Sequence, residues 1–133
     1  ICTFSSPVPL SFEKRFNECI KTLKSKGLNV YIDEDVLSDV AISKQLIANS
    51  LNKYLCDDKY DAVIPPWGGD FAIEILSLLD WETIAKSKPK WIFGFSDVST
   101  LTSAISLHVG WHTIHSSNLM QIAANENCDY VKS

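Results

Sequence analysis

No stretch of the sequence approaches the roughly 20 consecutive apolar residues that span a bilayer. No run of adjacent basic residues is longer than Lys14-Arg15, and the net charge is −4. Because basic side chains supply most of the affinity for nucleic acid, the sequence predicts no nucleic-acid partner. The lack of a long apolar run likewise predicts no membrane partner. Gly-x-Gly-x-x-Gly and Walker motifs are both absent, so nothing supports a nucleotide cofactor, and we predict no cofactor.

The cysteines are few and scattered: Cys2, Cys19, Cys56 and Cys128. No two of them form a Cys-x-x-Cys pair, so zinc binding is not predicted. Free thiols in a chain of 133 residues are typical of a reducing compartment, which predicts a cytoplasmic protein. Spacing carries no information on proximity, so whether all four are reduced stays open. Cys19 lies on the apolar face of an expected helix and is predicted to be a small core residue.

Length and composition indicate one ordinary globular domain. The 133 residues are 46% hydrophobic and 21% charged. The chain starts at Ile1, without Met or a secretory leader pattern, inside an apolar run typical of a strand, so we expect a fragment cut at both ends. We expect the domain to occupy residues 1–122, and the polar residues 123–133 to begin a linker.

Apolar runs alternate with helical patterns along the chain. Expected strands cover residues 1–4, 28–32, 61–64, 90–93 and 111–115, and expected helices cover residues 12–23, 42–55, 71–79 and 98–108, with a short extra turn after Asp80. Ser11 and Asp80 are expected N-caps, and Gly27 and Gly110 are expected to end helices. This alternation predicts a flavodoxin-like three-layer α/β sandwich with a mainly parallel sheet, whose functional residues lie at the carboxyl ends of strands.

Two of these strand ends contain residues that could take part in a reaction. Gly94-Phe95-Ser96-Asp97 lies between an expected strand and helix, where a sharp turn can expose a nucleophilic serine and unpaired N–H groups. The alternative is a helix start capped by Asp97. Pro65-Pro66-Trp67-Gly68-Gly69-Asp70 ends another strand, and its glycines can present N–H groups to an oxyanion or simply form a turn. Together the two turns suggest a nucleophile and an oxyanion hole.

Other polar clusters are less specific. Gly110 separates His108 from His112, so a shared metal site is not predicted. His115 could act as a base for Ser96 if its strand lies beside the serine's strand; otherwise it is structural or lines the substrate. The acidic run at residues 33–35 is expected to be a solvated loop, because a calcium loop needs further ligands. Trp67 either packs on substrate or is a buried strand-end residue.

Several motifs taken together resemble one known family. They are Trp67-Gly68-Gly69-Asp70, Glu74-Ile75-Leu76, Leu79-Asp80-Trp81-Glu82-x-Ile84, Pro89-Lys90-x-Ile92-x-Gly94-Phe95-Ser96-Asp97-x-Ser99-x-Leu101 and His115-Ser116-Ser117-Asn118-Leu119-Met120. The chain resembles the LD-carboxypeptidase family of serine peptidases, and within it the branch of microcin C immunity peptidases. The resemblance implies that Ser96 is the nucleophile and that the amides of Gly69 and Asp97 form the oxyanion hole. We expect Trp67, Gly68, Asp70 and His115 to line the substrate.

The chain departs from the family in two respects. Relatives have Gly-Pro where this sequence has Ser116-Ser117, which loosens the turn there. The family's catalytic Glu and His lie in a second, carboxyl-terminal domain, and this sequence stops at Ser133, so their identity stays open. The resemblance therefore implies the amino-terminal, nucleophile-bearing half of a peptidase, inactive alone, with that second domain as partner and a homodimer as a further candidate assembly.

The implied substrates are L,D-murein peptides or peptidyl- and aminoacyl-nucleotides of the microcin C kind, and the sequence does not decide between them. A non-catalytic flavodoxin-like module that binds an anion or regulates a partner is the alternative. Backbone strain at Ser96 would distinguish an enzyme from such a module, because a helix cap needs no strain.

Overall fold

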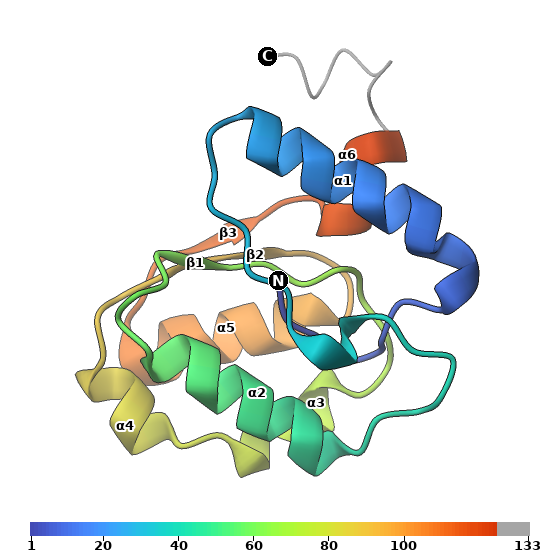
Figure 1. The fold of residues 1–133 in the computed structure, drawn as a ribbon. Helices are drawn as coiled ribbons and strands as arrows, with labels where there is room; N and C mark the ends of the chain where they lie inside the picture. The colour runs from blue at the N-terminus through green and yellow to red at the C-terminus, as the bar shows by residue number, and fades with distance from the viewer. Residues whose placement is uncertain (125–133) are drawn as a thin grey trace.

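The computed structural model describes residues 1–124 (Figure 1). The helices are α1 (Glu13–Ser25), α2 (Lys44–Cys56), α3 (Ala72–Ile75), α4 (Trp81–Lys86), α5 (Val98–Val109) and α6 (Leu119–Ala124). Short 3-10 turns are η1 (Leu10–Phe12), η2 (Glu34–Val36) and η3 (Leu76–Leu78). The part of the expected linker at residues 125–133 lies outside the described residues.

Three short parallel strands form the sheet in the order β1 (Ala62–Val63), β2 (Trp91–Gly94) and β3 (Thr113–His115). In the register, Val63 pairs with Ile92 and Gly94 pairs with His115. Because the strands are parallel, the turns that follow them leave from one edge of the sheet. Parallel strands are covered on both faces, which explains why their sequences read as apolar runs.

Helices cover the sheet on both sides (Figure 1). Helices α1 and α6 lie over one face, and α2 to α5 lie over the other. Val63 packs in a large cluster with α2 and α5 residues, whereas the next residue, Ile64, packs against a smaller cluster built from α1 and α6. The expected three-layer α/β sandwich with a parallel sheet is confirmed.

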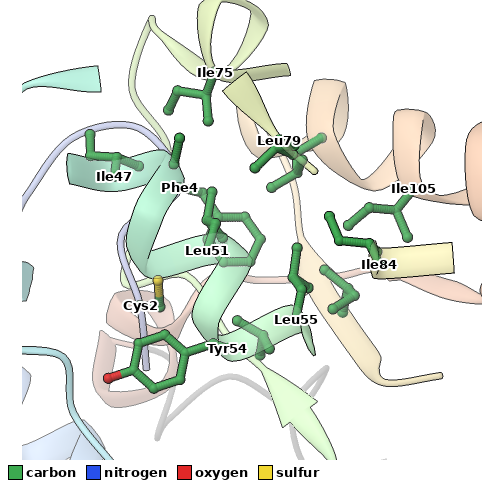
Figure 2. Close-up of a cluster of buried hydrophobic side chains, with 14 of the residues drawn as sticks. Cys2, Phe4, Ile47, Leu51, Tyr54, Leu55, Ile75, Leu79, Ile84 and Ile105 are labelled. Atoms are coloured by element: carbon green, nitrogen blue, oxygen red, sulfur yellow. The ribbon is translucent and has the colours of Figure 1, made fainter. Parts of the chain in front are cut away.

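The larger cluster is the main core of the domain. Figure 2 shows Leu51 and Leu55 of α2 among Phe4, Ile84 and Ile105, and all five side chains are fully buried. Cys2 joins this cluster, and Cys19 is buried in the smaller one, as predicted for a small core residue. The apolar stripe of α1 is likewise confirmed, because Phe16, Cys19 and Ile20 are its buried residues.

Helix ends follow the expected chemistry at most positions. The Asp80 carboxylate accepts the Thr83 N–H at 3.0 Å and caps α4, as predicted. Gly27 and Gly110 have φ of 83° and 72° just after α1 and α5, which confirms both as helix ends. The expected Ser11 cap is wrong, because Ser11 lies inside η1 and its side chain caps nothing.

The expected strands at residues 1–4 and 28–32 are not formed. Cys2 donates one backbone hydrogen bond to Ile64 at 3.3 Å, and Asp33 donates one to Ile1 at 2.9 Å. The Ile1 amino group also donates to the Tyr31 carbonyl. These few bonds do not extend into a ladder. The second segment is only partly covered: Val30 packs against the smaller cluster, whereas Leu28 and Tyr31 are each about half exposed. Its apolar composition therefore does not mark a strand that is buried on both faces.

Two further expectations need correction. The helix expected over residues 71–79 is shorter: α3 is followed at once by the tighter turn η3. The acidic run is not wholly solvated, because Asp33 is buried and accepts the Tyr54 hydroxyl at 2.9 Å. Burial and this hydrogen bond both raise the pKa of Tyr54 above its usual value. Within residues 1–124, none of the helices has the length and apolarity needed to cross a bilayer.

Leu51→Ala should destabilise the protein by about 2–5 kcal/mol, because it removes a fully buried side chain from the main core. Leu107→Ala is the matched control: it also changes a leucine in the interior of a helix, but Leu107 is 85% exposed. Urea unfolding of the two variants measures the difference. Equal midpoints for both would show that the core is misplaced.

Candidate active site

The Ser96 turn follows β2 directly. Gly94 has φ of 150°, and a Cβ there would lie 2.3 Å from a Val98 side-chain carbon, so only glycine fits where the chain turns into α5. The buried side chain of Asn118 supports the turn, because its Oδ1 accepts the Phe95 N–H at 3.1 Å. The turn closes with a hydrogen bond from the Ser99 N–H to the Ser96 carbonyl at 2.9 Å.

Ser96 has an unusual backbone conformation. Its φ is 62°, and it is the one non-glycine residue with positive φ among residues 1–124. Such a conformation costs about 1–3 kcal/mol and clusters at functional sites. The side chain is exposed, so the strain presents the hydroxyl to solvent at the start of a helix. A simple helix cap does not require this conformation.

The Gly68-Gly69 loop follows β1. The Pro65 and Pro66 carbonyls accept N–H groups of Leu119 and Met120, which ties the loop to α6. Gly69 has φ of 159°, and a Cβ on it would lie 2.3 Å from Ser5 Oγ and 2.5 Å from Ser6 Oγ. The loop therefore packs directly on the Ser5-Ser6 segment with no room for a side chain.

The two turns meet at the carboxyl edge of the sheet. A Cβ on Gly68 would lie 3.4 Å from Ser96 Oγ and 3.7 Å from the Asp97 amide nitrogen. Within the described part of the chain, neither the Gly69 amide nor the Asp97 amide donates a hydrogen bond. The site thus brings an exposed hydroxyl against the glycine loop, and the Gly69 and Asp97 amides are among the backbone donors of the two turns that have no partner within residues 1–124.

The Asp97 side chain does not cap α5, which was the alternative for this turn in the sequence. It makes no capping hydrogen bond to α5; its Oδ2 accepts the Ala72 N–H of α3 at 3.0 Å. Beside it, Ser5 Oγ accepts the Phe71 N–H at 2.9 Å. Ser5 was not among the expected site residues, and no local motif identifies it, because its role depends on a contact with a loop 66 positions away.

The remaining candidates lie around this centre. His115 is exposed and opposite Gly94 in the β2–β3 register, so its strand does lie beside the serine's strand. In the described structure no hydrogen bond joins its ring to Ser96. Trp67 is half-buried, and its Nε1 donates to the carbonyls of Ser6 and Pro7. Asp70, next to the loop, is exposed.

The histidines do not gather at a metal site. His108 lies in α5 and its ring packs on Trp81, with centroids 4.8 Å apart, whereas His112 and His115 lie after the helix. Among the described residues there is no group of three or more His, Cys, Asp or Glu side chains placed to hold a metal ion.

Comparisons with known proteins concern the family and the fold of this chain. The family described as LD-carboxypeptidase N-terminal domain matches residues 1–116. A protein of Treponema pallidum (strain Nichols), named "Putative carboxypeptidase", is 31% identical over 98 residues. Those residues are 74% of this chain but 28% of that relative, so the chain spans less than a third of its length.

Solved structures share the fold. An MccF-like protein from Bacillus anthracis str. Ames has a TM-score of 0.88 and 19% identity, covering 98% of this chain and 40% of that one. The microcin C7 self immunity protein MccF, in its wild-type apo state, has a TM-score of 0.83 and 22% identity, covering 92% and 37%. At these identities the likeness concerns the fold alone. The extent of the family match, however, shows that this chain belongs to the LD-carboxypeptidase N-terminal domain family.

Proposed function

We propose that this chain is the nucleophile-bearing domain of a serine-dependent amide hydrolase of the carboxypeptidase type. The observation that carries the proposal is the strained, exposed Ser96, which lies against the Gly68-Gly69 loop; within residues 1–124 the amides of Gly69 and Asp97 donate no hydrogen bond. The Ser96 hydroxyl attacks an amide carbonyl, and the amides of Gly69 and Asp97 stabilise the oxyanion that forms. Collapse of the intermediate expels the amine and leaves an acyl-enzyme, which water hydrolyses.

The base for this reaction comes from the rest of the polypeptide. A serine hydroxyl is a weak nucleophile unless a neighbouring group takes its proton. No side chain in the described part of the chain is hydrogen-bonded to Ser96. The chain covers 28–40% of the relatives it matches, which leaves room for a second domain. We assign the proton transfer to a Glu-oriented His in that domain, with His115 as the alternative within this one.

The exposed apolar surface beside the site suits such a second domain. Phe71 and Ile73, which follow the Gly68-Gly69 loop, are 44% and 62% exposed. Exposed apolar surface of this kind marks contacts with partners. We assign it to the remaining polypeptide, with a second copy of this chain as the alternative.

Because thiols such as Cys2 and Cys56 are unpaired, we place the protein in the cytoplasm.

Two substrate classes fit the proposal. One is an L,D-amide at the end of a murein peptide, which a carboxypeptidase of this family would cleave. The other is an aminoacyl- or peptidyl-nucleotide, and two solved MccF structures of the same fold hold glutamyl sulfamoyl guanosine and aspartyl sulfamoyl adenosine. In both classes the reacting group is an amide carbonyl, so Ser96 and the two amides would have the same roles.

In the full-length protein, Ser96→Ala should lower kcat by about 10⁶-fold, because it removes the nucleophile, and leave the thermal unfolding midpoint almost unchanged. Ser103→Ala, at an exposed position of α5, is the matched control with normal turnover. Both variants are assayed on an L,D-tetrapeptide and on an aminoacyl-sulfamoyl adenosine. Normal turnover of either substrate by Ser96→Ala would exclude Ser96 as the nucleophile for it.

Gly69→Ala should lower kcat by about 10²–10³-fold, the usual cost of losing one oxyanion donor. The new Cβ would collide with Ser5 Oγ and displace the loop. Gly27→Ala controls for backbone strain, because Gly27 also has positive φ but has open space around it. Steady-state kinetics on full-length variants should show loss of kcat for Gly69→Ala alone. Equal losses would mean that general destabilisation explains both.

Residues 1–133 alone should hydrolyse neither substrate class at an enzymatic rate, because the base is missing. Adding the carboxyl-terminal part of the protein as a separate chain should restore turnover in proportion to complex formation. The assay is substrate hydrolysis by each chain separately and then mixed. Robust turnover by residues 1–133 alone would place the base in this domain, with His115 tested first by His115→Ala.

A further inference from the structure

The two donors of the proposed oxyanion hole belong to different turns. Gly69 follows β1, and Asp97 follows β2. The last paired residues of β1 and β2 are Val63 and Ile92, several residues before either donor. Strand pairing therefore does not fix the distance between the two amides, and a contact between the turns themselves is needed.

The Asp97 carboxylate makes that contact. Its Oδ2 accepts the Ala72 N–H at 3.0 Å, and Ala72 is the first residue of α3, the helix that follows the glycine loop. Within residues 1–124, no hydrogen bond joins the serine turn to the glycine loop more directly. Asp97 follows Ser96 directly, and Ala72 lies three residues after Gly69. One side chain thus connects the serine turn to the chain that leaves the glycine loop.

Ser5 makes a second contact to the same segment. Its side chain is 2% exposed, and its Oγ accepts the Phe71 N–H at 2.9 Å. The same oxygen touches the face of Gly69 where a Cβ would point. The Phe71 and Ala72 amides are both occupied, whereas the amides of Gly68, Gly69 and Asp70 donate no hydrogen bond within residues 1–124.

We propose that the Asp97 side chain is a positioning residue that, together with Ser5, holds the Gly69 and Asp97 amides at the separation a tetrahedral oxyanion needs. This inference rests on the proposed function. The Asp97 backbone amide touches the oxyanion, whereas its carboxylate acts only through the glycine loop. Displacement of a catalytic group by about 1 Å can cost about 10²-fold in rate. The side chain should therefore affect kcat and leave KM almost unchanged.

The test compares Asp97→Ala with Asp97→Asn in the full-length protein. Asp97→Ala removes the acceptor but keeps the backbone amide, so kcat should fall by about 10²-fold at constant KM. Asp97→Asn keeps an oxygen that can accept the Ala72 N–H, so it should recover at least about ten-fold of that loss. Asp80→Ala is the control, because it removes a helix-capping carboxylate that bonds to Thr83, outside both turns, and should leave kcat unchanged.

Ser5→Ala provides an independent arm if Asp97→Ala fails to fold. Ser5→Ala should also lower kcat at constant KM, because it removes the acceptor of the Phe71 N–H. Ser43→Ala, which removes the cap of α2, should leave kcat unchanged. Normal kcat in Asp97→Ala would overturn the inference, and so would normal kcat in Ser5→Ala where Asp97→Ala fails to fold. An Asp97→Asn variant as slow as Asp97→Ala would overturn it too, because charge and not the hydrogen bond would matter. Activity retained by Ser96→Ala would instead refute the proposed function itself.

Discussion

Parallel pairing of β1 with β2 brings the serine turn and the glycine loop to the same end of the sheet, and the remaining features of the candidate site depend on it. Burial on both faces holds this pairing: Val63 and Ile92 pack into the main core, and Ile64 packs under α1 and α6. An antiparallel arrangement would send the chain after β2 to the opposite edge. The site is therefore a consequence of how the strands are connected and covered.

Within this frame, Ser96 is held in a conformation that its own sequence disfavours. Its positive φ persists because several contacts of the neighbouring residues hold the turn in place. Gly94 leaves space for Val98, Asn118 accepts the Phe95 N–H, and the Asp97 carboxylate is bonded to α3. The strain at Ser96 and the amides without partners within residues 1–124 therefore occur at the same place in the fold.

The sequence predicted those elements that depend on residues close together in the chain. Alternating apolar runs indicated β1 and β2, Asp80 indicated its cap, and Gly110 indicated the end of α5. The sequence could not show that residues 28–32 form no strand, because their apolar composition is typical of one. In the structure Val30 packs against the smaller cluster, while Leu28 and Tyr31 stay half exposed. Likewise, the partners of Asp97 and Ser5 depend on tertiary contacts, so the sequence left open whether Asp97 caps α5, and its side chain bonds to α3 instead.

The most direct test of the account is a crystal structure of the full-length protein treated with a serine-reactive phosphonate. The account predicts a covalent adduct on Ser96 Oγ, with one phosphonyl oxygen about 2.7–3.1 Å from the amide nitrogens of both Gly69 and Asp97. An adduct on another residue, or a Ser96 adduct whose oxygen points away from the Gly68-Gly69 loop, would contradict it.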